Sequence, residues 1–123
     1  MAWNLEDLQA IGESEELQIS SYRRDGSLRR WTTIWVVRVA DELYVRSAYG
    51  PDGAWYRNAM RTRRARVRVG GIESDVTLEQ VPDQDMNARV ETAYREKYRS
   101  QPGALRPMVT SPASETTVRL GVV

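Results

Sequence analysis

Cysteine and histidine are both absent from this sequence of 123 residues. Without cysteine the chain has no disulfides, no thiolate nucleophile and no thiolate metal site, which is compatible with an intracellular protein. Without histidine it lacks the commonest metal ligand and the one side chain that titrates near neutral pH unaided. Ser-His-Asp and Cys-His catalysis are therefore impossible for this chain. No metal-ligand cluster is present in the sequence, and we predict no metal site.

Long apolar runs and a strong net charge are missing as well. No stretch approaches the length that spans a bilayer, and the first twenty residues carry acids but no basic segment typical of a secretion signal. We therefore expect a cytoplasmic protein with no membrane partner. The formal net charge is only +1, which argues against nucleic acid as a partner for the molecule as a whole. The length fits one domain, which we predict to span residues 1–123.

Alternating apolar and polar side chains predict a mainly β protein. Six strands are expected, at residues 16–22, 30–39, 43–47, 64–69, 72–81 and 116–122. Asp25-Gly26 and Gly70-Gly71 are typical of hairpin turns, and a tight turn is expected at residues 40–42. Six short strands at hairpin spacing favour a small antiparallel barrel over a parallel sheet.

Helices are expected at three places between these strands. The predicted segments run from Asn4 as N-cap to about Gly12, from Asp52 as N-cap to about Arg61, and from Asp85 to Arg99. In the first of them Leu5, Leu8 and Ile11 share one face. Residues 101–114 are expected to form a loop with a helical turn starting at Ser111-Pro112.

Arginine provides 17 of the 18 basic residues, and Lys97 is the one lysine. Twelve of these arginines and three of the four tryptophans fall between Arg23 and Arg68. Arginine recognises phosphate or carboxylate in bidentate fashion, and tryptophan or tyrosine forms a flat wall for an aromatic ring. The segment therefore indicates a pocket for a nucleotide-like ligand. The alternative is that the arginines keep strand faces solvated while the tryptophans fill the core.

Candidates for acid-base chemistry are few. Asp83 and Asp85 are interpreted as N-terminal caps of a helix, where acids are favoured in any case. Lys97, between Tyr94 and Tyr98, is interpreted as a solvated charge on an amphipathic helix rather than as a base with a lowered pKa.

Several short motifs occur in an order that resembles a known superfamily. After Gly26 come RRWTTIWVV at 29–37, LYVRS at 43–47, WYRNA at 55–59 and RVRVGG at 66–71. This order is similar to the flavin-binding split-barrel superfamily, with its pyridoxamine-phosphate-oxidase-like and deazaflavin-dependent nitroreductase-like proteins. Within it, the sequence most resembles the bacterial family called domain of unknown function 2255. The resemblance implies a six-stranded antiparallel Greek-key split barrel that forms a homodimer, with FMN or a deazaflavin at the subunit interface.

The resemblance also implies which residues hold the cofactor. Arg30, three residues before the Thr33-Ile34-Trp35 step, takes the place of a basic phosphate contact. Ser47 closes the next strand, with Arg46 beside it as a second anionic contact. In the Trp-Tyr-basic-Asn run, the phosphate is assigned to Arg57 and local capping to Asn58. The implied cofactor-binding residues are Arg30, Thr32, Thr33, Arg46, Ser47, Trp55 and Arg57.

Three functions are considered on this basis. The first is an FMN- or deazaflavin-dependent reductase acting on a small molecule, in which the cofactor performs the hydride transfer. No catalytic residue is identified for it, although Tyr22, Tyr49 or Tyr56 could donate a proton. The second is a non-catalytic split barrel that binds a small anionic or aromatic ligand or acts as a dimeric interaction module. The third is single-stranded nucleic-acid binding on exposed tryptophans.

Overall fold

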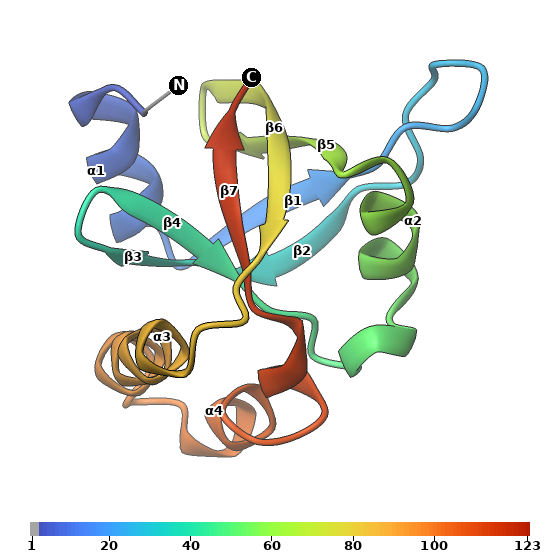
Figure 1. Ribbon diagram of the computed structural model, residues 1–123. Helices are drawn as coiled ribbons and strands as arrows, with labels where there is room; N and C mark the ends of the chain where they lie inside the picture. The colour runs from blue at the N-terminus through green and yellow to red at the C-terminus, as the bar shows by residue number, and fades with distance from the viewer. Residues whose placement is uncertain (1–2) are drawn as a thin grey trace.

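The computed structural model describes residues 3–123, so the predicted domain of 1–123 includes two residues that lie outside the described part. The strands form one antiparallel sheet in the order β2-β1-β5-β6-β7-β4-β3, which curves into a nearly closed barrel (Figure 1). The strands are β1 Glu16–Ser20, β2 Thr32–Trp35, β3 Val37–Val39, β4 Glu42–Val45, β5 Arg64–Val69, β6 Ile72–Gln80 and β7 Val118–Val122. The predicted mainly β barrel is confirmed.

The structure has seven strands where six were predicted, because the expected strand 30–39 is interrupted at Val36. Its first part, β2, pairs with β1, and its second part, β3, pairs with β4. These two parts are the outermost strands of the sheet, and one residue joins them. The sheet must therefore curve until its two edges come together.

The interruption is stabilised by side chains from a distant helix. The Val36 N–H donates to the hydroxyl of Tyr98 at 3.2 Å, and that hydroxyl donates to the carbonyl of Glu15 at 2.5 Å. The Val36 carbonyl accepts a hydrogen bond from Lys97 at 2.6 Å. Because the Val36 side chain is completely buried, these contacts satisfy backbone groups that would otherwise be costly to bury.

The helices are α1 Leu5–Glu13, α2 Ala54–Thr62, α3 Gln84–Lys97 and α4 Pro102–Met108, with short 3-10 turns at Gly50–Asp52 and Ala113–Thr116. As predicted, α1 begins after the N-cap Asn4, whose side chain accepts from the Asp7 N–H at 2.8 Å. Leu8 and Ile11 are buried, but Leu5 is exposed, so the expected apolar face is shorter than predicted. Within residues 3–123, none of these helices combines the length and apolar character needed to cross a membrane.

Two features of the helices differ from the prediction. Asp52 was expected to cap α2, but the N-cap is Gly53, and Asp52 ends the preceding 3-10 turn. Residues 101–114 were expected to form mainly a loop, but they contain α4, which packs Leu105 and Met108 into the core. The helix was not predicted because its seven residues include two prolines and a glycine, which have low helix propensity. Burial of its apolar side chains stabilises it instead.

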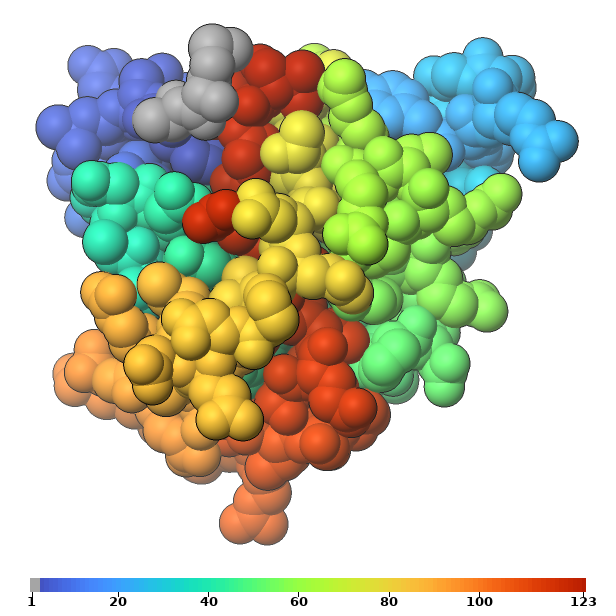
Figure 2. All heavy atoms as spheres, viewed as in Figure 1, coloured from blue at the N-terminus to red at the C-terminus, as the bar shows by residue number. Residues whose placement is uncertain are grey.

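The turns follow the predicted chemistry. Gly26 and Gly70 both have positive φ, at +90° and +56°, as the two hairpin turns require. The connection between β1 and β2 projects from the barrel beside α2 and β5, as the space-filling view shows (Figure 2). Apolar side chains form one core inside the barrel and a second one between β3, β4 and the helices α3 and α4.

Candidate functional site

Four of the seven predicted cofactor-binding residues line one cavity of about 300 Å³, and they come from three separate segments of the chain. Thr32 and Thr33 lie on β2, Arg46 follows β4, and Trp55 lies on α2. We call this site the aromatic cavity. Its lining residues are Glu16, Thr32, Thr33, Ile34, Trp35, Arg46, Ala48, Tyr49, Trp55, Ala104 and Met108.

Aromatic rings form the walls of this cavity, and other rings hold them in place. Trp35 stacks on Tyr98 with ring centroids 3.7 Å apart and an interplanar angle of 2°. Trp55 meets the buried ring of Tyr56 edge to face at 5.8 Å. Tyr49 is 83% exposed and also lines the cavity. Rings fixed in this way offer flat apolar surface to a flat aromatic ligand.

Arg46 belongs to the cavity wall, but its guanidinium is engaged by the protein. It is 1% exposed and donates to the hydroxyl of Thr117 at 2.8 Å and to the carbonyl of Met108 at 2.9 Å. Glu91 lies 3.7 Å from it. Burial lowers the pKa of Arg46, and the neighbouring Tyr94 and Glu91 act against this shift. Arg46 therefore gives the wall positive charge while most of its donors are occupied.

Ser47, another predicted contact, lies beside the start of α2. It is 1% exposed, and its hydroxyl oxygen has no hydrogen-bond partner. A Cβ at Gly53 would lie 2.3 Å from that oxygen, so the backbone approaches closely only because residue 53 is glycine. Gly53 has no side chain to cap α2, and the first N–H groups of a helix attract negative charge. Trp55, one residue inside this helix, lines the cavity.

Arg30 and Arg57, the predicted phosphate contacts, are exposed and are not among the residues that line the aromatic cavity. Asn58 was expected to have a capping role, but it lies inside α2 and lines a second cleft. The phosphate assignments therefore remain predictions.

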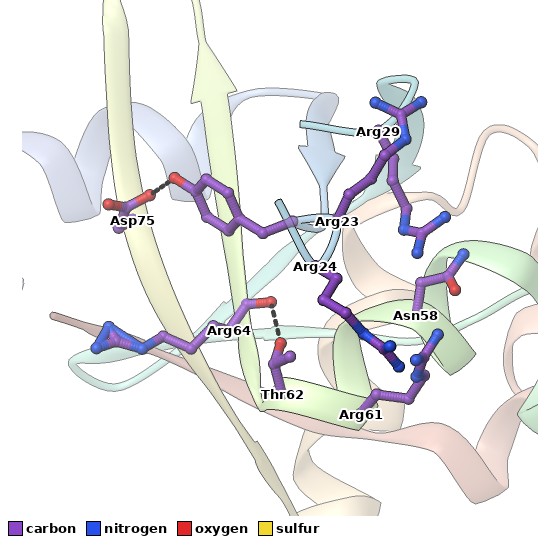
Figure 3. Close-up of a pocket in the computed structure, with 9 residues that line it drawn as sticks. Arg23, Arg24, Arg29, Asn58, Arg61, Thr62, Arg64 and Asp75 are labelled. Carbon is purple, nitrogen blue, oxygen red and sulfur yellow. Dashed lines mark hydrogen bonds between the residues drawn. The ribbon is translucent and has the colours of Figure 1, made fainter. Parts of the chain in front are cut away.

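The second cleft, of about 640 Å³, was not singled out from the sequence. It lies between the β1–β2 connection, α2 and the start of β5, and Figure 3 shows its side chains. We call it the arginine cleft. Its lining residues are Tyr22, Arg23, Arg24, Arg29, Asn58, Arg61, Thr62, Arg64 and Asp75. The signal in the sequence was the clustering of arginines, but which of them converge depends on how the hairpin lies against α2.

Two of the three arginines of β5, Arg66 and Arg68, favour the solvated-strand interpretation. Arg66 pairs with Glu73 at 3.0 Å and with Asp75 at 3.1 Å on the neighbouring strand. Arg68 covers the ring of Trp31 at 4.1 Å and donates to Gln18 at 2.6 Å. These two arginines therefore have partners on the sheet itself.

Lys97 is not the solvated charge that its helix position predicted. Its ammonium donates to the carbonyls of Ser14 and Val36, each at 2.6 Å. Burial lowers the pKa of Lys97 to about 8, and Glu15 acts in the opposite direction. Lys97 lines neither the aromatic cavity nor the arginine cleft, so it acts as a structural contact between α3, α1 and Val36.

Comparison with known families decides the classification. Residues 7–120 match a bacterial family described as "Uncharacterized protein conserved in bacteria (DUF2255)". The chain belongs to the DUF2255 family. This confirms the resemblance stated from the motifs. No curated protein matches this DUF2255 chain.

Solved structures of the same fold are numerous. A conserved hypothetical protein from Mycobacterium tuberculosis matches with a TM-score of 0.71 and 16% identity, covering 99% of this chain and 81% of that one. HutZ, the heme storage protein from Vibrio cholerae, matches with a TM-score of 0.64 and 11% identity, covering 100% of this chain and 92% of that one. An F420-H2 dependent reductase matches with a TM-score of 0.61 and 13% identity, covering 86% and 93%. At these identities the matches show the shared split-barrel fold.

Proposed function

We propose that this DUF2255 protein binds a flavin or a deazaflavin in the aromatic cavity and acts as an oxidoreductase on a small molecule. The observation that carries the proposal is the gathering of Thr32, Thr33, Arg46 and Trp55 around one cavity. The similarity of the fold to an F420-H2 dependent reductase also supports it. Fold similarity is a limited guide to function, so the argument depends mainly on the cavity itself.

The residues present fit a flat heterocycle with an anionic substituent. A volume of about 300 Å³ is at the lower end of small-molecule sites, which suits a ring system. Trp35, Trp55 and Tyr49 would contact its faces, and polar groups of Thr32 and Thr33, from the backbone or a side chain, would bind its polar edge. The uncapped N-terminus of α2, with Arg57 and Arg30, would attract its phosphate. FMN or a deazaflavin supplies hydride transfer when bound.

Tyr49 is the best candidate for a proton donor to a reduced substrate. Of the three tyrosines considered, Tyr22 lines the arginine cleft and donates its hydroxyl to Asp75. Tyr56 is buried, and its hydroxyl accepts from Gln80 at 3.3 Å. Tyr49 is the one of the three that lines the aromatic cavity. Because Tyr49 belongs to the cavity lining, its hydroxyl could reach a substrate bound there.

The proposal includes a homodimer in the cytoplasm. The ring of Tyr49 is 83% exposed beside a cavity with aromatic walls, and covering such a surface removes apolar area from water. A second copy packed here would close the cavity and exclude water from the cofactor. Sedimentation of the purified protein, with and without FMN, would test this part of the proposal.

Cofactor titration tests the main proposal. Binding of FMN and of a deazaflavin to the purified protein is measured by quenching of the cofactor's fluorescence. We expect micromolar affinity for one of them and a loss of about tenfold or more in Thr33→Val and Trp55→Leu, whose side chains line the cavity. The matched control is Trp31→Leu, because Trp31 lies outside the cavity beneath Arg68. Absence of binding to both cofactors would refute the proposal.

A non-catalytic ligand-binding protein is the second candidate, and the state of Arg46 favours it. The one guanidinium in the wall is occupied by Thr117 and Met108, and the one carboxylate in the wall is that of Glu16. Such a cavity holds an aromatic ligand without activating a substrate. The two candidate functions are distinguished by measuring, with stopped-flow, how fast nitroaromatic and quinone acceptors oxidise the reduced, bound cofactor. Oxidation no faster than for free reduced cofactor, despite tight binding, would favour the second candidate.

A further inference from the structure

The arginine cleft holds more positive charge than the surrounding residues neutralise. Arginines from three elements line it: Arg23, Arg24 and Arg29 from the β1–β2 connection, Arg61 from α2, and Arg64 from β5. In Figure 3 the side chains of Arg24 and Arg61 lie beside each other next to Asn58, while Arg64 points away from them.

The one carboxylate in the lining is already bound by other groups. Asp75 accepts a hydrogen bond from the hydroxyl of Tyr22. It also forms an ion pair with Arg66, whose guanidinium nitrogen lies 3.1 Å from the carboxylate oxygen. The hydrogen bond from Tyr22 lowers the pKa of Asp75 most, and the one from Arg66 lowers it further. The same hydrogen bond to Asp75 raises the pKa of Tyr22. Asp75 is therefore an anion that pairs with Arg66, which is outside the lining, and within residues 3–123 it forms no ion pair with the arginines that line the cleft.

The arginines of the cleft are largely without partners. Arg23 donates to the carbonyl of Leu28 at 2.7 Å. Within residues 3–123, Arg24, Arg29, Arg61 and Arg64 form no ion pair, and the Nε of Arg29 is buried without any hydrogen-bond partner. An unpaired buried donor is costly in a protein that binds nothing at that place.

We infer that the arginine cleft is a binding site for a small polyanion that carries two or more phosphate or carboxylate groups. Guanidinium groups that face one concavity repel each other, and a multivalent anion removes that repulsion while accepting bidentate hydrogen bonds. A volume of about 640 Å³ is well within the range of small-molecule sites. Asn58 and Thr62 add neutral polar groups to the same lining.

A small anion fits the cleft better than a nucleic-acid strand does. Single strands are held by aromatic platforms on which bases stack, and the one aromatic lining residue, Tyr22, is fixed to Asp75 by its hydroxyl. The chain as a whole has a formal net charge of only +1, so the positive charge is local to this region. The site is also separate from the aromatic cavity, because the two share no lining residue.

Calorimetric titration of the full chain tests this inference without any cofactor. The probes are sodium triphosphate, citrate and orthophosphate, so that phosphate and carboxylate chemistry are distinguished. The variants are Arg24→Ala and Arg61→Ala, whose side chains are exposed and form no ion pair within residues 3–123. The matched control is Arg99→Ala, an exposed arginine that lies outside the cleft.

We expect triphosphate or citrate to bind more tightly than orthophosphate. Each cleft variant should weaken that binding by about tenfold or more, because charge-assisted hydrogen bonds are lost. Arg99→Ala should leave it within about twofold, since an exposed unpaired charge contributes little. The inference is overturned if neither polyanion binds, or if the cleft variants and the control bind alike. Arginine-dependent binding of a single-stranded oligonucleotide alone would overturn it equally. Retention of triphosphate binding in Thr33→Val would show that the polyanion does not bind in the aromatic cavity, so this inference stands or fails separately from the proposed function.

Discussion

Trp35 and Tyr98 stack almost parallel, with their ring centroids 3.7 Å apart, although one lies on β2 and the other at the end of α3. Tyr98 uses its ring to support a wall of the aromatic cavity and its hydroxyl to bind the backbone at Val36. The closure of the barrel and the shape of the cavity therefore depend on the same side chain.

The hydroxyl of Tyr98 should contribute measurably to stability. Tyr98→Phe keeps the stacked ring but leaves the Val36 N–H and the Glu15 carbonyl without their partner. We expect a loss of about 1–3 kcal/mol in the free energy of unfolding, measured by urea denaturation. The control is Tyr94→Phe, because the buried Tyr94 hydroxyl has no hydrogen-bond partner. Equal destabilisation by the two variants would contradict the assigned role.

Arg46 should not tolerate replacement by lysine. A lysine ammonium cannot reproduce the fork that reaches both the Thr117 hydroxyl and the Met108 carbonyl from a fully buried position. We expect Arg46→Lys to lower the free energy of unfolding by about 2 kcal/mol, as measured by thermal and urea denaturation. Arg95→Lys is the control, since Arg95 contacts the same Glu91 from an exposed position at 3.9 Å. A change of less than about 0.5 kcal/mol in Arg46→Lys would show that the fork is not needed.

Gly53 should be intolerant of a side chain because of Ser47. A Cβ at position 53 would lie 2.3 Å from the Ser47 hydroxyl oxygen, so Gly53→Ala should cost about 1–3 kcal/mol of stability. Combining it with Ser47→Ala removes that oxygen and should recover part of the loss in a double-mutant cycle. Gly71→Ala is the control, because nothing lies within 4 Å of a Cβ there. Additive effects of the two substitutions would contradict the predicted clash.

Lys97 should make stability depend on pH in the alkaline range. Burial lowers its pKa from 10.5 to about 8, so between these values the folded chain holds fewer protons than the unfolded chain. The contribution of Lys97 to the free energy of unfolding therefore rises as the pH increases from about 8 to about 10.5. Tyr98 acts in the opposite direction at high pH, since burial raises its pKa to about 12.

The contribution of Lys97 is isolated by comparison with Lys97→Met. We expect the stability of the unmodified chain to rise relative to that of the variant over this range, measured by urea denaturation at each pH. A difference that stays constant with pH would show that the Lys97 pKa is not lowered by folding.

The sequence alone predicted much of the fold, because its signals are local. Alternation gave the span of β5 without error, and the glycines at positions 26 and 70 marked turns that need positive φ. The order of motifs identified the family, and four of the seven residues that the resemblance assigned to a cofactor line one cavity. The missing histidine and cysteine excluded whole classes of chemistry by composition, whatever the fold.

Tertiary structure decided what depends on contacts between distant segments. The strand predicted over 30–39 divides at Val36 because Lys97 and Tyr98, far away in the sequence, bind its backbone. Arg46 is a buried structural group because it donates hydrogen bonds to Thr117 and Met108. Helix α4 is stable because its apolar side chains pack into a core. The arginine cleft likewise arises where a hairpin lies against α2. Local patterns determine which residues form strands and turns, whereas burial, charge compensation and cavities depend on which segments fold against each other.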